Sequence, residues 1–241
     1  MLRMILICLS LFSQFDLKAK EKKLEVSQIA DNVFLHKSYQ EIEPWGLVGA
    51  NGMVVIDGND AHIIDTPWTE KQTDELVAWI RAKGFKVKSV VATHYHYDAS
   101  GGLSYFKDKG VNTYATSLTN RLLAAKERVL ANNEIKTNLF PLVEGKVEVF
   151  YPGPGHAKDN VVVWLPSEKI LFGGCFVKSL RSKTLGNLED ASVSDWPNSI
   201  QNIINQYPDI KTVVPGHGSQ GNVELLLHTR NMAIKKKHAD D

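Results

Sequence analysis

Residues 87–98 read VKSVVATHYHYD, an apolar strand that runs straight into a segment rich in metal-binding side chains. The valine-rich run Val87–Ala92 predicts a buried strand, and His94, His96 and Asp98 follow it directly. Residues two apart in an extended chain point the same way, so His94 and His96 can present their imidazoles to one ion. Asp98 can turn toward a second ion. The stretch therefore indicates a metal site at the end of a buried strand.

Three further candidate ligands also follow predicted strands. His156 follows Val147–Tyr151, Cys175 follows Ile170–Phe172, and His217 follows Thr212–Val214. Zinc takes histidine nitrogen, cysteine sulfur and carboxylate oxygen as ligands. Glycines flank all three residues, and they let the backbone adopt special conformations and approach closely. We therefore expect four loops to converge at one edge of a sheet sandwich.

Each candidate also has an ordinary interpretation. A lone loop histidine is usually at the surface or hydrogen-bonded, a lone cysteine is usually small and buried, and Asp98 could cap a helix that begins at Ala99. The ordinary interpretation would have to be correct independently for all six residues, which is a less economical explanation than a single metal site. The remaining histidines lack a clustered partner, and we interpret them as structural or solvent-facing: His36, His62, His228 and His238.

The rest of the chain predicts mixed sheets with helices on their outer faces. Its first half is rich in short strands, with hairpin connections expected at Gly49–Gly52 and Asp57–Asp60. The predicted strands of this half are Val33–Leu35, Leu47–Val48, Met53–Ile56 and His62–Asp65, and Val161–Leu165 and Ile170–Phe172 follow later. A helix is expected from Thr69, with Gln72 completing a capping box, to Gly84. Further helices are predicted at Ser117–Leu130, Asn198–Gln206 and Asn222–Lys236.

Composition limits the function classes. The 241 residues carry 28 basic and 27 acidic side chains, a formal net charge of +1, and no basic stripe that would indicate nucleic-acid binding. The run Lys235–Lys237 is typical of a solvated helix end. Composition therefore gives no indication of a nucleic-acid partner. We separately expect a small-molecule substrate and a monomer.

The N-terminus predicts export. Arg3 precedes the apolar stretch Met4–Phe12, which is too short to span a bilayer, and lysines follow. We predict a signal peptide at residues 1–19, one domain at residues 20–241, and a periplasmic location without a membrane anchor. Cys8 is a poor fit to a lipoprotein site because Ile7 precedes it. Cleavage leaves only Cys175, which is then unpaired, intermolecular, inert or bound to metal.

The order His-x-His-x-Asp, His156, Cys175, His217 resembles the metallo-β-lactamases, specifically their subclass B1 and its acquired carbapenemases. The similarity runs from about Asn32 to Gly218. It includes Asn160–Leu165, Phe172–Lys178 and Leu185–Leu188.

The resemblance implies an α+β fold, a four-layer αββα sandwich with a two-zinc site at one edge of the sheets. The first zinc would be held by His94, His96 and His156, and the second by Asp98, Cys175 and His217. Asp65 would be a buried carboxylate behind the ligands.

The resemblance also implies the reaction, hydrolysis of the β-lactam amide of penicillins, cephalosporins and carbapenems by a metal-bound hydroxide, which confers antibiotic resistance. Asp98 and Asn187 would be the catalytic residues, with Asn187 near the lactam carbonyl. Lys178 would bind the substrate carboxylate, and Trp45, in the covering hairpin Tyr39–Gly46, would contact the substrate.

The chain departs from the family pattern at three places. Tyr97 is bulky for its position, Pro44 stiffens the covering loop, and Arg181–Thr184 lengthens the route from Lys178 to Asn187. None of these departures changes a predicted ligand.

Two other functions share these features. Thioester hydrolases, lactonases and nucleases use the same fold, but many carry a histidine where Ala99 stands and an aspartate where Cys175 stands. A non-catalytic zinc-binding protein would also use histidine and cysteine. Three ligands per ion leave coordination positions open, which favours the enzyme.

Overall fold

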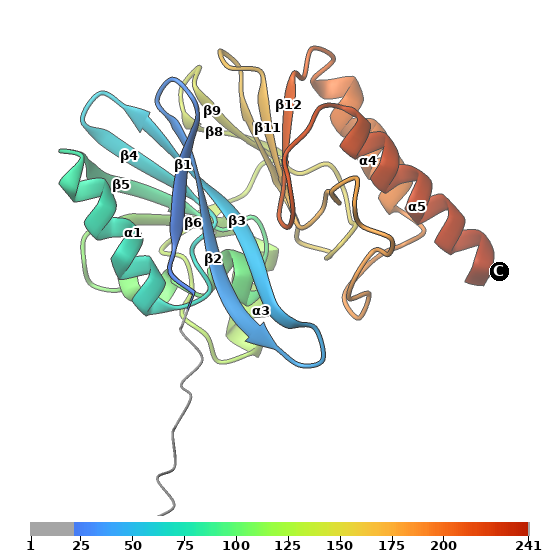
Figure 1. The fold of residues 1–241 in the computed structure, drawn as a ribbon, viewed down its shortest axis with the longest axis horizontal. Coiled ribbons are helices and arrows are strands. Elements are labelled where there is room, and N and C mark those ends of the chain that lie inside the picture. Colours follow the sequence, from blue (N-terminus) through green and yellow to red (C-terminus); the bar gives the residue numbers. More distant parts are fainter. Residues whose placement is uncertain (1–21, 241) are drawn as a thin grey trace, which may run out of the picture.

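The computed structural model describes residues 22–240, which form two β-sheets packed face to face with helices outside them (Figure 1). The seven-stranded sheet has the order β1-β2-β3-β4-β5-β6-β7, antiparallel from β1 to β4 and parallel from β4 to β7. Its strands are β1 Glu25–Ala30, β2 Val33–Ile42, β3 Gly46–Asp57, β4 Asp60–Ile64, β5 Lys86–Val91, β6 Asn112–Thr116 and β7 Asn133–Ile135.

The second sheet has five strands in the order β12-β11-β10-β9-β8, and only the β11–β12 pair is parallel. Its strands are β8 Leu139–Val143, β9 Val147–Phe150, β10 Val162–Leu165, β11 Ile170–Gly174 and β12 Thr212–Pro215. Because β11 and β12 are parallel, the loops after them leave the sheet at the same edge.

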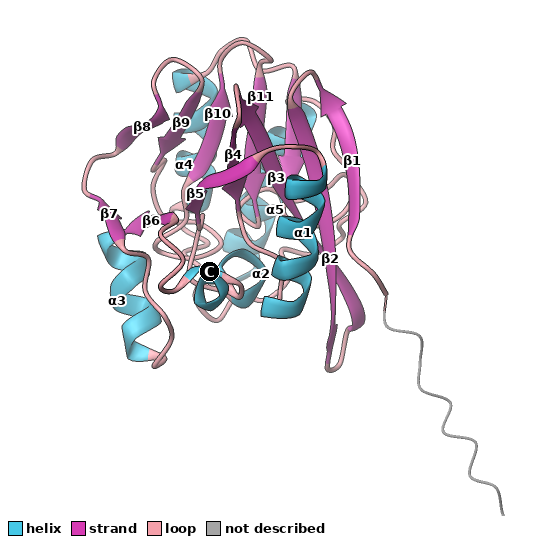
Figure 2. Ribbon diagram, turned by 90° about the vertical axis from the view of Figure 1, so that its left-hand side faces the viewer, coloured by secondary structure: helices cyan, strands magenta, loops and turns pink. Residues whose placement is uncertain are grey.

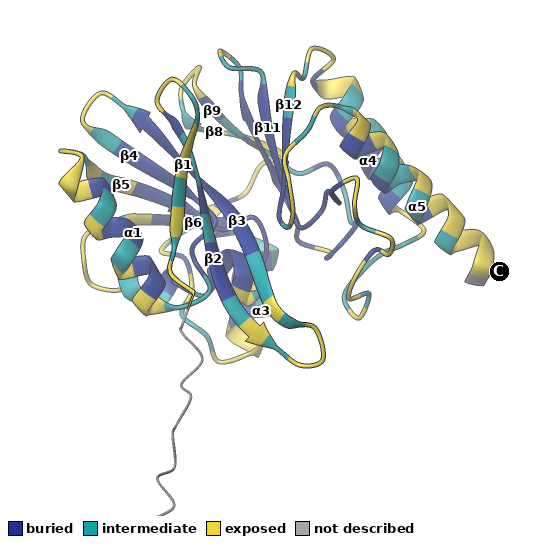
Figure 3. Ribbon diagram, viewed as in Figure 1, coloured by how far each residue is buried: buried dark blue, intermediate teal, exposed yellow. Residues whose placement is uncertain are grey.

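Helices cover the outer face of each sheet. α1 Glu70–Ala82 and α3 Ser117–Ala125 pack on the seven-stranded sheet, and α4 Trp196–Gln206 and α5 Glu224–Asp240 pack on the five-stranded sheet (Figure 1). The short helix α2 Tyr97–Ser100 and the 3-10 helix η1 Leu103–Phe106 connect β5 to β6. Buried residues line the layers, and the outer sides of α4 and α5 are exposed (Figure 3).

Alternating side chains of β3 show why the layers form. Met53 and Val55 pack between the sheets with Phe172 of β11, while Val54 faces Leu76 of α1. Successive residues of a strand point to opposite faces, so an apolar strand buries one face against the other sheet and one against helices. The same alternation in the second sheet buries Trp164 and Leu171 against α4 and α5. This arrangement confirms the predicted αββα sandwich.

The start of α1 follows the sequence prediction in part. The Thr69 hydroxyl accepts a hydrogen bond from the backbone N–H of Gln72 at 3.2 Å, as an N-cap does. The Gln72 side chain instead donates to the backbone carbonyl of Tyr39 at 2.8 Å. Gln72 therefore joins α1 to β2 and does not close the predicted capping box.

The predicted hairpin connection at Gly49–Gly52 is wrong. These residues lie inside β3, which pairs with β2 without interruption from Gly46 to Val55. A Cβ atom at Gly52 would overlap the imidazole of His36 on β2. The glycine therefore allows close packing within the sheet and does not form a turn. The connection predicted at Asp57–Asp60 is present between β3 and β4.

The predicted helix Ser117–Leu130 is too long, because α3 ends at Ala125. Glu127 has a φ of 53°, which no helix interior accommodates, and the chain turns there. The turn brings the Arg128 guanidinium onto the backbone carbonyl of Tyr95 at 2.5 Å and the Ser100 hydroxyl at 3.0 Å. These contacts tie the end of α3 to the histidine-rich segment.

The predicted signal peptide at residues 1–19 lies outside the described residues. Within residues 22–240, the helices are too short or too polar to cross a membrane.

Candidate metal centre

Four loops meet at one edge of the sandwich, and each carries one or more of the predicted ligands. β5 leads to His94, His96 and Asp98, the segment after β9 carries His156, β11 leads to Cys175, and β12 leads to His217. Figure 2 shows α2 beyond the end of β5, at the same end of the sheets as the tip of the β2–β3 hairpin. Backbone connectivity therefore brings ligands from residues 94 to 217 to one place.

Hydrogen bonds across the two sheets fix these loops. The Asn51 side chain, on β3, donates to the backbone carbonyls of Pro215 at 2.8 Å and Gly218 at 2.9 Å. The His217 Nδ1 lies 2.8 Å from the Gly49 carbonyl, which leaves Nε2 to face the site. Gly216 has no room for a side chain, because a Cβ atom would overlap the backbone and Sγ of Cys175. The β12 loop is therefore packed directly against the β11 loop.

One trio of predicted ligands is in direct contact. The Cys175 Sγ lies 3.0 Å from Oδ2 of Asp98 and 3.3 Å from Nε2 of His217. The same Asp98 oxygen is 3.0 Å from the His217 Nε2. The alternative that Asp98 merely caps a helix is wrong. The N-cap of α2 is His96, and Asp98 lies in the first turn of this helix with its carboxylate facing Cys175.

The three remaining histidines lie beside this trio. The His96 Nδ1 is 3.2 Å from the His156 Nε2, and the His94 Nε2 is 3.5 Å from Oδ1 of Asp98. Donor atoms within 4.8 Å of one another form three overlapping groups: His94, His156 and Cys175; His94, His96 and Asp98; Asp98, Cys175 and His217. The structure thus brings all six predicted ligands together.

The unsatisfied atoms of the site fit a metal. The His94 Nε2 and the Asp98 Oδ1 are buried without a hydrogen-bond partner, and buried polar atoms are otherwise almost always paired. Burial lowers the pKa of His94 to about 3 and also lowers the pKa of His156, so both imidazoles are neutral and offer lone pairs. Mixed histidine, cysteine and carboxylate donors are the ligand set of zinc.

The thiol of Cys175 fits the same interpretation. Burial raises its pKa well above the ordinary value, and the neighbouring Asp98 carboxylate raises it further, so the metal-free cysteine keeps its proton. A thiol ligand binds zinc as the thiolate, so zinc binding displaces that proton. The positive charge of the zinc ion would then compensate the Cys175 thiolate, which lies next to the Asp98 carboxylate.

Asp65 lies behind the ligands, as the resemblance implied. It is 2% exposed, and its two oxygens accept hydrogen bonds from the Thr93 N–H at 2.7 Å and the Thr93 hydroxyl at 2.8 Å. Its backbone carbonyl is 3.0 Å from the His36 Nε2. Asp65 thereby fixes the residue that precedes His94, and His36 has the structural role that was predicted for it.

The other histidines outside the cluster are also accounted for. The His62 Nδ1 is 2.7 Å from the Ser89 hydroxyl, and the His228 Nε2 is 3.0 Å from the Ser182 carbonyl. His238 is exposed near the end of α5.

Four of the predicted ligands line a cavity of about 700 Å³: His96, Asp98, His156 and His217. The predicted substrate-binding residues Trp45, Lys178 and Asn187 all line it. Trp45 is 64% exposed at the tip of the β2–β3 hairpin, and Lys178 is 9% exposed with its Nζ 5.5 Å from the Trp196 ring. The Asn187 Oδ1 accepts the backbone N–H of Glu189 at 3.0 Å, which leaves its NH₂ group as the donor toward the cavity.

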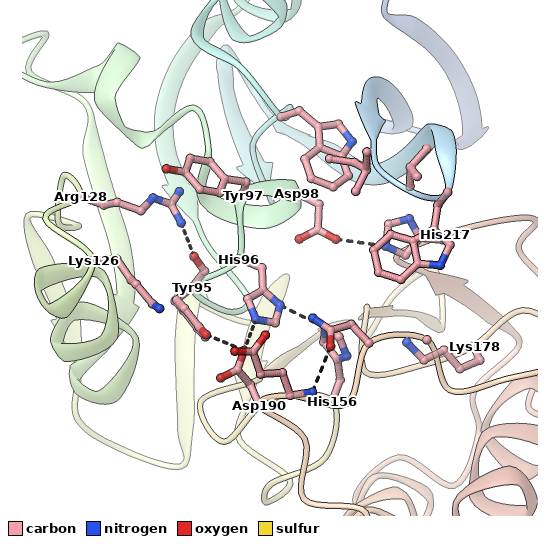
Figure 4. A pocket seen from close by; sticks show the side chains of 17 residues that line it. Tyr95, His96, Tyr97, Asp98, Lys126, Arg128, His156, Lys178, Asp190 and His217 are labelled. Carbon is pink, nitrogen blue, oxygen red and sulfur yellow. Dashed lines mark hydrogen bonds and ion pairs between the residues drawn. The ribbon is translucent and has the colours of Figure 1, made fainter.

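The bulky Tyr97 causes no conflict with the ligands. Its ring is 59% exposed and is stacked by the Arg128 guanidinium at 3.7 Å. Figure 4 shows Tyr97, Arg128 and Lys126 on one side of the ligand cluster and Lys178 on the other. Tyr97 therefore forms a wall of the cavity and leaves the metal ligands undisturbed.

Two residues at the site were missed by the sequence analysis. The Asp190 Oδ2 is 3.0 Å from the Nε2 of His96 and 2.6 Å from the Tyr95 hydroxyl, which donates to it. Asp190 lies in an irregular loop with no periodic signal, so only the tertiary structure places it beside His96. Tyr95 lies between His94 and His96 in the sequence, and this position was the only sign that it could contribute to the site.

The fold and the ligand cluster together define a metal-binding αββα protein, and comparisons with known proteins specify it further. The Metallo-beta-lactamase superfamily model matches residues 45–217. A metallo-beta-lactamase type 2 of Pseudomonas aeruginosa is 41% identical over 212 residues, 88% of this chain and 85% of that protein. The chain therefore belongs to the metallo-β-lactamase superfamily.

Solved structures agree with this assignment. The crystal structure of VMB-1 is 55% identical, with a TM-score of 0.88, and the match covers 90% of this chain and 99% of that chain. A structure of TMB-1 is 49% identical with the same TM-score and the same coverage.

Proposed function

We propose that this protein hydrolyses the amide bond of β-lactam antibiotics with two zinc ions and thereby confers resistance. The observation that carries the proposal is the convergence of six zinc-type ligands from four loops at an open cavity that four of them line. The family membership supports the same activity.

The ligands divide into two sets in this proposal. His94, His96 and His156 would hold the first ion, and Asp98, Cys175 and His217 would hold the second. Contacts of 3.0 to 3.3 Å within the second set support its assignment. Three protein ligands leave further coordination positions of each ion open, as catalysis requires and storage does not.

Zinc held by these residues would lower the pKa of a bound water to about 7 and would polarise a carbonyl oxygen. The protein's own residues orient the substrate against that chemistry. Lys178 anchors the carboxylate that β-lactams share, as a point charge held near the Trp196 ring. The Asn187 NH₂ group donates to the lactam carbonyl oxygen, where negative charge develops in the transition state. Trp45 covers the ring and excludes solvent.

The balanced reaction adds one water across the lactam C–N bond. The carbonyl carbon gains a hydroxyl and becomes a carboxylic acid, which ionises to a carboxylate. The C–N bond breaks, and the ring nitrogen takes up a proton. Penicillins, cephalosporins and carbapenems all carry this bond and a nearby carboxylate, so we include all three in the substrate range. We also propose export to the periplasm through residues 1–19 and action as a monomer.

Hydrolysis of a chromogenic cephalosporin tests the proposal. We expect turnover by the zinc-loaded protein, loss of turnover after treatment with a chelator, and recovery on adding zinc. The bound metal is counted in the same samples. A folded protein that holds two zinc ions and turns over no penicillin, cephalosporin or carbapenem would show that the site serves zinc binding or another hydrolysis.

A further inference from the structure

We propose that Tyr95 is a positioning residue of the metal centre, whose hydroxyl holds Asp190 against His96 and so fixes which ring nitrogen of His96 faces the metal. This inference rests on the proposed metal centre. It adds a residue that the six-ligand description leaves out.

One carboxylate oxygen connects the three side chains. The Tyr95 hydroxyl donates to Oδ2 of Asp190 at 2.6 Å, and the His96 Nε2 lies 3.0 Å from the same oxygen (Figure 4). The rings of Tyr95 and His96 are also in contact, with their centroids 4.5 Å apart. The three groups thus form a compact unit at the edge of the ligand cluster.

Tyr95 is the rigid member of this unit. Its side chain is 7% exposed, and its backbone N–H donates to the Asp159 carboxylate at 2.9 Å. Its carbonyl accepts hydrogen bonds from Arg128 at 2.5 Å and from the Ser100 hydroxyl at 2.8 Å. With both backbone groups and the ring fixed, the hydroxyl has a defined position.

Asp190, in contrast, has no such support of its own. It lies between β11 and α4 in a loop without regular structure, and its side chain is 37% exposed. A half-exposed aspartate on a loop samples several rotamers unless a partner selects one. The Tyr95 hydroxyl, held by a buried residue, supplies that partner together with the His96 ring.

The consequence for His96 follows from donor and acceptor roles. An ionised carboxylate only accepts hydrogen bonds, so the His96 Nε2 must carry the proton. The lone pair then lies on Nδ1, the nitrogen 3.2 Å from the His156 Nε2. A carboxylate behind a ligating histidine sets its tautomer and orientation in this manner. Tyr95 extends the effect by one hydrogen bond.

The test is the substitution Tyr95→Phe, which removes only the hydroxyl. The matched control is Tyr105→Phe, because the Tyr105 hydroxyl also donates to an aspartate, Asp74, at 2.7 Å but lies on the exposed face of α1 and η1. Zinc dissociation constants are measured by competition with a chromogenic chelator. We expect Tyr95→Phe to weaken one of the two zinc sites about tenfold and Tyr105→Phe to match the parent protein.

A double-mutant cycle with Asp190→Asn separates positioning from a general structural role. If Tyr95 acts through Asp190, the double variant binds zinc no more weakly than Asp190→Asn alone. Nitrogen-15 NMR of the zinc-free protein adds a direct observation: the parent shows His96 protonated on Nε2, and Tyr95→Phe shows a mixture of tautomers.

The outcomes separate this inference from the proposed function. A parent protein that binds fewer than two zinc ions contradicts the proposed metal centre. A parent with two zinc ions and a Tyr95→Phe variant of equal affinity and unchanged His96 tautomer overturns the inference alone. Additive losses in the double variant would also overturn it, because Tyr95 would then act independently of Asp190.

Discussion

The Sγ of Cys175 lies 3.0 Å from Oδ2 of Asp98, although 77 residues separate them in the sequence. Both side chains are buried, the His217 imidazole contacts both of them, and the charge of Lys178 acts on both. Two groups that are both anionic as metal ligands are stable at this distance only when a cation lies between them or one keeps its proton. We therefore expect zinc binding at this pair to be coupled to loss of the thiol proton.

Replacing Cys175 with serine tests this coupling. A hydroxyl is a much poorer zinc ligand than a thiolate and stays protonated at neutral pH, so we expect Cys175→Ser to weaken the second zinc selectively. The loss should exceed the roughly 10–100-fold that removal of an outer hydrogen bond causes, and turnover should fall sharply. Metal titration checks the result. Two undiminished zinc sites would contradict the assignment of Cys175 as a ligand.

Lys178 gives a prediction about substrate binding. Lys178→Met keeps the apolar stem near Trp196 but removes the charge. A hydrogen bond to a charged group contributes about 1.5–3 kcal/mol, so KM for carboxylate-bearing β-lactams should rise roughly 10–100-fold with a smaller change in kcat. The exposed Lys136→Met serves as the control. An unchanged KM, or an equal rise for a substrate whose carboxylate is esterified, would remove Lys178 from the substrate site.

The sequence predicted the buried strands and the ligand cluster well for the same reason. Apolar runs such as Val90–Ala92 are stable only when buried, and we expected ligands directly after such a run to lie at the edge of a sheet. The full length of β3 could not be predicted from its sequence. Both faces of the strand are covered, so apolar and polar residues do not alternate, and its glycines resemble a turn. Position 52 has room only for glycine because the His36 ring packs against it. This contact between two strands is not visible in any local sequence pattern.

The site was predicted less completely at its outer contacts. Asp190 reaches His96 from a loop 94 residues away, and Asn51 reaches Gly218 across 167 residues. Asp190 lies in an irregular loop, and Asn51 lies in β3 far from any ligand in the sequence. Candidate ligands can be recognised from their residue types, histidine, cysteine and aspartate. The contacts that support them depend on how the two sheets pack, which the sequence does not show directly.

Asn51 provides a prediction about this support. Its amide donates to the Pro215 and Gly218 carbonyls on either side of His217. Asn51→Ala leaves the buried Pro215 carbonyl and the more exposed Gly218 carbonyl without that donor, so we expect a loss of about 1–3 kcal/mol in the free energy of unfolding and weaker binding of the second zinc. Denaturant unfolding and metal titration measure the two effects. The exposed Asn112→Ala should change neither. A variant that unfolds and binds zinc as the parent does would show that β12 positions His217 without Asn51.

Metal removal gives the last prediction, because the buried atoms His94 Nε2 and Asp98 Oδ1 make no hydrogen bond among the described residues. A ligand that binds only the folded state stabilises it by about 2.7 kcal/mol at a concentration 100 times its Kd. For a domain of this size, that free energy corresponds to a rise in Tm of roughly 5–10 °C. We expect the zinc-free protein to unfold that much lower, with the difference growing as zinc is added. Magnesium, which prefers oxygen ligands, should leave Tm unchanged. Equal Tm values with and without zinc would mean that these atoms are not metal ligands, whatever the resemblance implies.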